Sequence, residues 1–402
     1  MSRPTPDVCL ISPYPPRGER HGGHSGVASY TAHLAHALSD AGARVEVVAP
    51  RADGEPERSQ DGPVAIHRAF ATGPAALPAA ARAAGRTGAP LTHLQHETFL
   101  YGGPASVAGL APALAALRAR RGTVVTMHHV VDPKAVDADF VALHRVGAPV
   151  GLARAGIAAV RSSIRRLADA VVVHEPGFAE VVDGSRVVPH GVEPGGGPAD
   201  AVAAFRAAHG LDDGRLVVLA FGFLAPYKGL ERLLRAGRLA SESVHVVIAG
   251  GEHPRMGGPG GYADELVNAY GDVATFTGRV PDADVAACFG AADLAAFLYP
   301  QPVGTSGALA LALAHRTPIL VSRALAGNAG VPDALVAPDG DAALAARLRD
   351  LAHDGVARDA LRDVAGELLD GRTWAAVARR HLDLYEEVSH ADRRARRGLR
   401  AA

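Results

Sequence analysis

Short apolar runs alternate with longer segments of helical period along the chain, most clearly between residues 216 and 322. Runs such as LVVLAF and VHVVIA are almost continuously apolar, which is typical of strands buried on both faces of a sheet. Glycine or lysine stands where such a run gives way to a helix. The alternation predicts a parallel sheet with helices on both faces, and ligands bind at the carboxyl ends of the strands in such sheets.

The first half of the chain shows the same alternation. Its first strand is followed by a loop rich in proline and glycine, PYPPRGERHGGHSG, and then by a helix over Val27–Ala41. We therefore expect this half to form a Rossmann-like unit of its own. The predicted strands are Val8–Ser12, Arg44–Ala49, Val64–Arg68, Leu91–Gln95, Thr123–His128 and Ala170–His174, and the further helices are Pro104–Arg120, Val136–Arg145, Leu152–Ala168 and Gly177–Val182.

A cluster of proline and glycine from Pro194 to Pro198 predicts a linker between two domains. We expect an N-terminal domain over residues 1–193 and a C-terminal domain over residues 199–372. A last helix follows GRTW over residues 373–390, with Thr373 as its N-cap and Trp374 as an anchor. Residues 391–402 are expected to form a basic, solvated tail.

Composition narrows the class of protein. A chain of 402 residues can form two domains of ordinary size, and its net charge of −1 gives no electrostatic reason to bind nucleic acid. Its two cysteines, Cys9 and Cys288, lie far apart, which argues against a disulfide framework and fits a cytoplasmic protein. We expect no signal peptide, because the N-terminus lacks a basic region followed by a long apolar core, and no transmembrane segment, because no apolar run approaches about 20 residues.

Two segments in the second half could bind an anion. Lys228, in FGFLAPYKGLERLL, follows a strand and a proline turn and precedes a helix, where an ammonium can pair with a diphosphate. The loop Gly304-Thr305-Ser306-Gly307 opens another helix, so its N–H groups and hydroxyls could cradle a pyrophosphate. A random exposed lysine and a helix cap without a ligand are the alternatives. The turn Gly250-Gly251 after VHVVIA could contact a nucleobase or ribose.

In the first half, polar groups gather at predicted strand ends. The loop Gly22-Gly23-His24-Ser25-Gly26 precedes a helix, so Gly26 and its neighbours could bring backbone N–H groups close to a ligand; a flexible turn is the alternative. His96 and Glu97 follow a strand in LQHETFLYGG, as active-site residues do, although a surface loop with a satisfied histidine explains them equally well.

His128 and His129 end another strand, in VVTMHHV. A metal held by both is disfavoured, because adjacent strand residues point to opposite faces. A buried, hydrogen-bonded histidine is the alternative to a catalytic one. We expect no metal at the two D-x-D sequences, Asp137-Ala138-Asp139 and Asp282-Ala283-Asp284, because both stand at predicted helix starts, where acidic residues favour the helix dipole.

Taken in order, the blocks between residues 216 and 322 resemble the C-terminal domain of family 4 glycosyltransferases. The resemblance implies the α/β GT-B fold, with two Rossmann-like domains facing a cleft and a last helix that crosses back to the first domain. It also implies transfer of a sugar from a nucleotide-diphosphate sugar to a small-molecule or glycan acceptor, with retention and without a metal or cofactor. Lys228 and the loop from Gly304 would then bind the diphosphate.

The same resemblance places His128, His96 and Glu97 near the sugar and acceptor, with His174-Glu175 and His190 lining the cleft. Three positions depart from the family: Phe223 stands where arginine is usual, and Val303 and Leu311 where glutamates are usual. Leu311 cannot hold a ribose as a glutamate does. Two alternatives therefore stay open: a non-standard enzyme on this fold (a pseudo-glycosyltransferase, a transferase to an unusual nucleophile, or a sugar-nucleotide epimerase), or a non-catalytic nucleotide-sugar binding protein.

Overall fold

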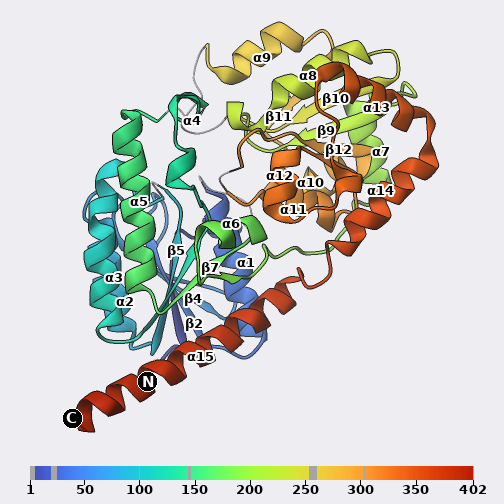
Figure 1. Cartoon of the computed structure of the whole chain (residues 1–402). Coiled ribbons are helices and arrows are strands. Elements are labelled where there is room, and N and C mark those ends of the chain that lie inside the picture. Colours follow the sequence, from blue (N-terminus) through green and yellow to red (C-terminus); the bar gives the residue numbers. More distant parts are fainter. Residues whose placement is uncertain are drawn as a thin grey trace.

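The computed structural model describes residues 5–19, 25–98, 100–143, 146–252, 260–302 and 304–401. Figure 1 shows two α/β lobes, one built by each half of the chain, and a long C-terminal helix that leaves the second lobe and runs along the first. This is the two-lobed GT-B architecture that the sequence predicts. None of the helices in the described part of the chain has both the length and the apolar character that a membrane span requires.

The first lobe is built on an eight-stranded sheet with the order β3-β4-β2-β1-β5-β6-β7-β8. All its neighbouring strands run parallel except β3, which pairs antiparallel with β4 at the sheet edge. The central strands are buried on both faces, as their continuous apolar runs predict. The strands are β1 Val8–Ile11, β2 Val45–Pro50, β3 Arg58–Asp61, β4 Val64–Phe70, β5 Leu91–His96, β6 Gly122–Met127, β7 Ala170–Val173 and β8 Arg186–Val187.

The helices of the first lobe are α1 Gly26–Asp40, α2 Ala76–Thr87, α3 Leu110–Arg118, α4 Ala138–Leu143, α5 Val150–Leu167 and α6 Pro176–Val181. The helix expected over Pro104–Arg120 divides into a 3-10 turn, Pro104–Gly109, and α3. Pro112 explains the division, because proline fits the first turn of a helix but breaks its interior. The expected helix Val136–Arg145 shortens to α4, which Asp137 caps by accepting a hydrogen bond from the Phe140 N–H at 2.8 Å; residues 144–145 lie outside the described part.

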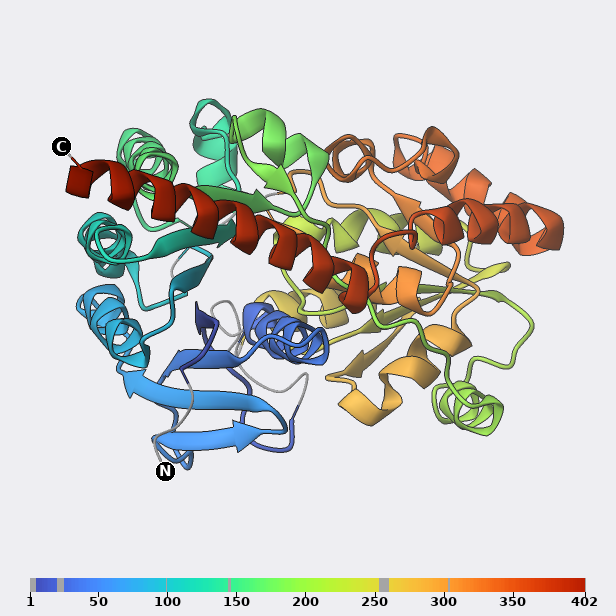
Figure 2. The ribbon, with the colours of Figure 1, turned by 90° about the horizontal axis from the view of Figure 1, so that it is seen from below.

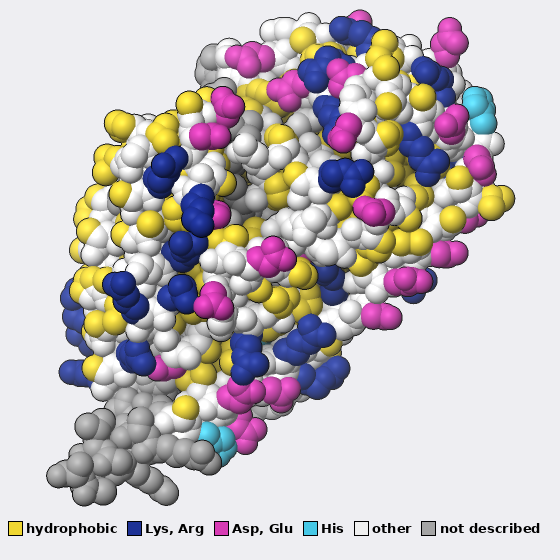
Figure 3. Space-filling model, in the orientation of Figure 1, with side chains coloured by type: hydrophobic (Ala, Val, Ile, Leu, Met, Phe, Trp, Pro, Cys, Tyr) yellow, Lys and Arg dark blue, Asp and Glu magenta, His cyan; other side chains and the backbone are white. Residues whose placement is uncertain are grey.

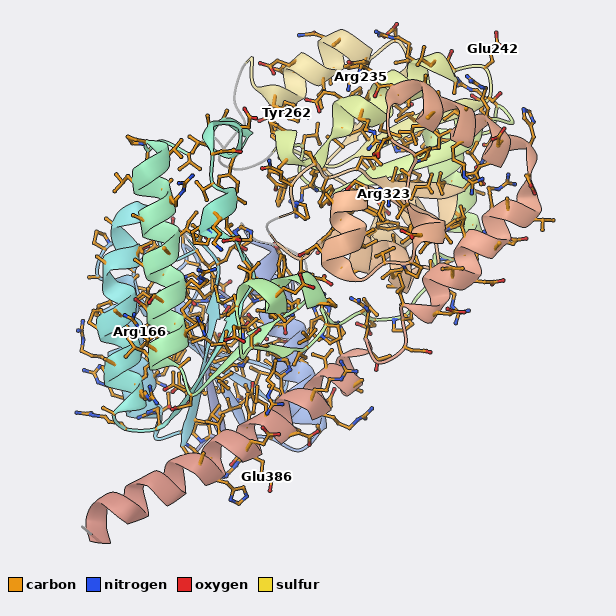
Figure 4. All side chains as sticks on the ribbon, in the orientation of Figure 1. Arg166, Arg235, Glu242, Tyr262, Arg323 and Glu386 are labelled. Carbon is orange, nitrogen blue, oxygen red and sulfur yellow. The ribbon has the colours of Figure 1, made fainter. Side chains whose placement is uncertain are left out.

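Helix α5 packs on the outer side of this lobe, and its solvent side carries arginines that form part of a row of dark blue side chains in Figure 3. Arg166, labelled in Figure 4, lies on this exposed side. Others tie α5 to its neighbours: Arg154 donates to the Val136 carbonyl at 2.8 Å, and Arg165 lies 3.3 Å from Asp183. The arginines therefore contribute to the packing of this lobe.

The second lobe has a five-stranded parallel sheet with the order β11-β10-β9-β12-β13. Its strands are β9 Leu216–Phe221, β10 Val244–Ala249, β11 Ala274–Gly278, β12 Leu294–Phe297 and β13 Ile319–Val321. Its helices are α7 Ala199–Ala208, α8 Leu230–Leu239, α9 Tyr262–Tyr270, α10 Val285–Ala291, α11 Gly307–Ala314, α12 Arg323–Ala329, α13 Asp341–His353 and α14 Gly355–Glu367.

The strand order of each sheet defines where a ligand can bind. In the second lobe the chain moves outward from β9 to β10 and β11, then returns to the other side of β9 with β12. In sheets of this kind ligands bind at the carboxyl edge where the order reverses, which here is the edge between β9 and β12. In the first lobe the same reversal falls between β1 and β5. Both reversal points coincide with segments that the sequence analysis selected.

Helix α15, Trp374–Ala401, crosses back from the second lobe to the first, where it packs against α1 and β6 (Figure 2). Thr373 caps it, as expected, by accepting a hydrogen bond from the Ala376 N–H at 3.3 Å. Its apolar side, including Val377, Leu384 and Val388, enters the core of the first lobe, while Glu386 points to solvent in Figure 4. The helix continues through residues 391–401, where a separate tail is expected, because alanine and arginine favour helix.

The two segments that join the lobes lie side by side. The Val192 N–H donates to the Arg372 carbonyl at 2.8 Å, so the linker after β8 pairs with the segment before α15. Gly191 lies against the Trp374 indole so closely that a Cβ there would overlap the ring. The Tyr30 ring from α1 lies 5.3 Å from that of Trp374 and 5.1 Å from that of His190. We call Tyr30, His190 and Trp374 the hinge cluster.

Candidate active site

Lys228 lies at the carboxyl end of β9, on the second-lobe side of the site. After β9 the chain turns through Gly222, with φ +102°, into the 3-10 turn Pro226–Lys228, which ends at Gly229, with φ +65°. Nζ of Lys228 donates to the Phe221 carbonyl at 3.2 Å, which folds the side chain back over the strand end. Burial lowers the pKa of Lys228 to about 8, so most of the ammonium stays protonated at pH 7.

The start of α11 lies next to this ammonium. A Cβ built on Gly222 would lie 2.6 Å from the Lys228 Nζ and 3.8 Å from the Ala308 Cβ, so the ammonium fills the space beside Gly222 and the first turn of α11 lies close by. Gly229 packs against the Leu298 carbonyl in the loop after β12, which fixes the two loops against each other. A side-chain cation and a helix N-terminus therefore meet at the reversal point of the sheet.

The two hydroxyls of the loop Gly304–Gly307 have different surroundings. Ser306 caps α11: its Oγ accepts from the Leu309 N–H at 3.1 Å and lies 2.9 Å from the Tyr299 hydroxyl. The Thr305 Oγ1 atom is buried and has no hydrogen-bond partner. Gly307 begins the helix and is exposed. The Thr305 hydroxyl and the first N–H groups of α11 are therefore the parts of this loop that a ligand can use.

Gly250 and Gly251 form the turn after β10, beside the Lys228 loop. A Cβ on Gly250 would overlap the Gly222 carbonyl, and the Leu224 N–H donates to the Gly251 carbonyl at 3.0 Å. These contacts explain the Gly250 position by backbone packing. They also place the turn at the same sheet edge as the Lys228 loop, with Arg279 from the turn after β11 on its other side.

The first lobe contributes His96, Glu97 and His129 to the opposite wall. His129 pairs through its backbone with Gly304, and a Cβ on Gly304 would lie 2.6 Å from the His129 Cδ2. The His129 Nε2 lies 3.8 Å from the Glu97 Oε1. His96 is buried with no hydrogen-bond partner for Nδ1, and burial, aided by His129, lowers its pKa to about 4. The two lobes therefore touch where these polar groups gather.

His128 lies behind this wall. Its Nε2 lies 2.8 Å from the Gln95 Oε1, and its Nδ1 lies 3.2 Å from the His174 Nε2. The ring stands edge-on to Tyr30, with the ring centroids 4.8 Å apart, and burial keeps the pKa of His128 well below its ordinary value. Both ring nitrogens are thus engaged within the lobe, whereas the neighbouring His129, which was not among the residues expected near the sugar, lies at the contact between the lobes.

Gly26 is the first residue of α1, at the reversal point of the first sheet. Ser25 caps this helix by accepting from the Val27 N–H at 3.1 Å. Space at the Gly26 Cβ position is open. Residues Gly22, Gly23 and His24 lie outside the described part of the chain, so the expected glycine loop is seen only at its end.

The three departures from the family pattern have different surroundings. Phe223 is 39% exposed in the Lys228 loop. Leu311 packs against the apolar core of the second lobe. Val303 lies outside the described residues.

Asp282-Ala283-Asp284 forms a 3-10 turn before α10, and no group of three or more His, Cys, Asp or Glu within the described ranges is arranged to hold a metal ion.

Comparison with known families agrees with this geometry. Residues 24–195 match the family described as Glycosyltransferase Family 4, and residues 215–354 match the family described as Glycosyl transferases group 1. Together the two matches span most of the chain. The protein therefore belongs to glycosyltransferase family 4, and it is a glycosyltransferase that transfers a sugar from a nucleotide sugar.

Solved structures with the same fold cover almost the whole chain. Sucrose-phosphate synthase from Thermosynechococcus elongatus is 20% identical with a TM-score of 0.72, over 96% of this chain and 99% of that one. HepE from Anabaena, in complex with UDP-glucose, is 14% identical with a TM-score of 0.68, over 94% and 99%. WaaG, a glycosyltransferase involved in lipopolysaccharide biosynthesis, is 14% identical with a TM-score of 0.63 over the same shares. At these identities the likeness shows the GT-B fold, and a search of curated proteins found no match.

Proposed function

We propose that this enzyme transfers a glycosyl group from a nucleotide-diphosphate sugar to a small-molecule or glycan acceptor, with retention at the anomeric carbon. The observation that carries the proposal is the meeting of Lys228 with the start of α11 at the reversal point between β9 and β12. A diphosphate placed there faces an ammonium, the free N–H groups of a helix and the unpartnered Thr305 hydroxyl.

This arrangement can promote cleavage of the sugar–phosphate bond. As the bond between the anomeric carbon and the diphosphate oxygen breaks, negative charge grows on the departing diphosphate. Groups that are already fixed around that charge stabilise the transition state more than the ground state. Because Lys228 and the α11 dipole supply this positive charge, we propose a reaction that needs no metal. Retention is the stereochemistry that the family resemblance implies.

On the opposite wall we assign His96 and Glu97, with His129, to the sugar and the acceptor. Glu97 can accept a proton from a hydroxyl or hold it in place, and His129 lies beside it at the contact between the lobes. We also assign His128 to the site. It lies behind these residues, where Gln95 and His174 contact its two ring nitrogens. Gly26, Gly250 and Gly251 are proposed to bring backbone close to the donor.

The first test is thermal stabilisation by UDP, GDP, ADP, TDP and CDP, each with magnesium and with a chelator. UDP leads the list, because the HepE structures hold UDP or UDP-glucose. A ligand at about 100 times its dissociation constant adds roughly 2.7 kcal/mol to the free energy of unfolding. We expect a clear response to one nucleotide, unchanged by the chelator. No response to any of the five would overturn the proposed donor site.

Product analysis completes the test. With the responding nucleotide as its sugar conjugate, proton NMR of the product should show the anomeric configuration of the donor. Inversion would contradict the proposed stereochemistry, and an isomerised donor without transfer would favour the epimerase alternative.

A further inference from the structure

A row of buried polar side chains connects α15 to the end of β7 through the first sheet. It begins at the Tyr385 hydroxyl, which lies 2.6 Å from the His93 Nδ1. The Gln95 amide lies 3.3 Å from the His93 Nε2 on one side and 2.8 Å from the His128 Nε2 on the other. The His128 Nδ1 in turn lies 3.2 Å from the His174 Nε2. All five side chains are buried, so their polar atoms depend on partners inside the protein.

The last contact of this row has only one possible direction. The His174 Nδ1 lies 2.8 Å from the Val188 carbonyl, which can accept a hydrogen bond but cannot donate one. His174 therefore carries its proton on Nδ1, and its Nε2 is an acceptor while the ring is neutral. Burial keeps the ring neutral, since it lowers the pKa of His174 to about 3. The His128 Nδ1 must then donate to His174, because the reverse direction would bring two acceptors together at the Val188 carbonyl.

The same assignment passes along the rest of the row. A neutral His128 with its proton on Nδ1 has an acceptor at Nε2, so Gln95 turns its amide nitrogen toward that atom. Half a turn of the amide is enough, because its oxygen and nitrogen exchange places. The Gln95 oxygen then accepts from the His93 Nε2, which also lies 2.7 Å from the Thr126 Oγ1. The remaining His93 nitrogen accepts from the Tyr385 hydroxyl, so every contact of the row has one donor and one acceptor.

The row joins the strand ends that form the first-lobe side of the site. Gln95 lies one residue before His96 in β5, and His128 directly follows β6. A Cβ on Gly304 would lie 3.2 Å from the His128 carbonyl oxygen. The His128 ring is therefore held within the first lobe, while its backbone lies against the diphosphate loop of the second.

We propose that this row is one directional chain of hydrogen bonds, from the Tyr385 hydroxyl to the Val188 carbonyl, and that its members are positioning residues for His128. The chain holds the His128 proton on Nδ1 and the end of β6 against the diphosphate loop. Its role in turnover rests on the proposed donor site. Hydrogen bonds in such a chain strengthen one another in a buried environment, and the partner of one ring nitrogen determines what the other can do.

Nitrogen NMR of protein with labelled histidines tests the direction of the chain. Correlations from the ring protons distinguish a protonated ring nitrogen from an unprotonated one. Comparison with His128→Gln and His174→Gln assigns these two rings among the 19 histidines, and the nearby Tyr30 ring identifies His128 independently. We expect both residues to be neutral at pH 7 with the proton on Nδ1, although a free histidine side chain favours Nε2. A wild-type His128 protonated on Nε2 would overturn the chain.

Tyr385→Phe tests what the chain does for the reaction, because it removes the first hydroxyl and keeps the ring. We expect turnover at saturating substrates to fall at least about fivefold, on the order of one lost hydrogen bond. The dissociation constant of the responding nucleoside diphosphate should stay within about twofold of the wild type, since its proposed contacts lie in the other lobe. Tyr30→Phe is the matched control: Tyr30 is buried against His128, but its hydroxyl has no hydrogen-bond partner.

Turnover of Tyr30→Phe should equal that of the wild type. Equal turnover in the two variants, or a loss in Tyr385→Phe that extends to nucleotide affinity, overturns the positioning role while the donor site stands. Absence of nucleotide binding in the wild type instead overturns the donor site and, with it, the role in turnover. The NMR experiment needs no ligand, so it tests the chain in either case.

Discussion

Lys228 carries the charge on which the proposed chemistry depends. Lys228→Ala removes the ammonium that we propose to face the departing diphosphate, beside Gly222. We expect turnover to fall at least tenfold, which corresponds to about 1.4 kcal/mol of lost transition-state stabilisation. Steady-state rates at saturating donor measure it. Lys134, the only other lysine in the chain, is exposed on the turn Pro133–Ala135, so Lys134→Ala is the control. A near-normal rate for Lys228→Ala would remove Lys228 from the mechanism.

Arg316 has a backbone conformation that costs stability. It follows α11 with φ +53°, in the left-handed region, where a side chain is disfavoured by roughly 1–2 kcal/mol. Arg316→Gly should raise the free energy of unfolding by about 0.5–1 kcal/mol, since part of the relief is offset by the flexibility of glycine in the unfolded chain. Urea unfolding measures it. Arg316→Ala keeps the strained φ and should not stabilise; equal gains in both variants would contradict this explanation.

Some site residues follow from the sequence pattern, and others do not. Lys228 and the loop from Gly304 were predicted together, and they lie together, because both follow parallel strands at one sheet edge. Which of His128 and His129 lies at the contact between the lobes was not predictable. Adjacent strand residues face opposite sides of the sheet, and the pattern does not say which side faces the site. The Ser306 hydroxyl caps α11, which is the alternative named for this loop, and its contact with the Tyr299 hydroxyl comes from the tertiary structure.

At the scale of elements, the crossing between the lobes depends on close packing of Gly191 against Trp374. Gly191→Ala would place a methyl group inside the indole ring, so the linker or the start of α15 must move. We expect a loss of about 1–3 kcal/mol in the free energy of unfolding, as for other overpacked sites. Gly196→Ala in the same linker is the control, because nothing lies within 4 Å of its Cβ position. If the two variants unfold at the same urea concentration, the linker can move to accommodate the added methyl group without loss of stability.

The elements that the sequence predicts well are those whose apolar runs stand out from polar flanking residues. Buried parallel strands such as β5 and β6 were predicted almost to the residue. The edge strand β3, RSQD, is wholly polar, and α2 is rich in alanine with an uncapped start, so neither stands out from a loop. Both are held by tertiary contacts, β3 by pairing with β4 and α2 by packing on the sheet. Such contacts are absent from the local pattern.

At the scale of the whole molecule, the contacts between lobes were beyond the reach of the sequence. The pairing of His129 with Gly304 and the approach of Glu175 to Thr305 join residues more than a hundred positions apart. Each side could be recognised alone as a strand end or a helix start. Their meeting depends on how the two lobes are placed against each other, to which the hinge cluster and the packing of α15 on the first lobe contribute.

The whole molecule should also lose stability in mild acid, because it buries neutral histidines. Burial lowers the pKa of His96, His190 and His381 to about 4 and that of His174 to about 3, with His93 and His128 also well below their ordinary value. The unfolded chain takes up these protons near pH 6.5, whereas the folded protein takes them up only at lower pH, near pH 4 for His96, His190 and His381. This contribution to stability is therefore complete above pH 6.5 and is lost as the pH falls toward 4.

At pH 5 each of the four histidines with a pKa of about 3 or 4 costs roughly 2 kcal/mol, which is a large share of the ~5–15 kcal/mol that holds a typical domain together. Glu175 acts in the opposite direction, since its raised pKa favours the folded state at low pH and disfavours it as the pH rises through 7. We expect the urea midpoint to fall steeply between pH 6.5 and pH 5. His381→Gln should flatten that slope, because it removes one of the buried protonation sites. A urea midpoint that stays constant from pH 7 to pH 5 would contradict this prediction. It would show that these histidines take up protons in the folded protein as readily as in the unfolded chain, despite their burial.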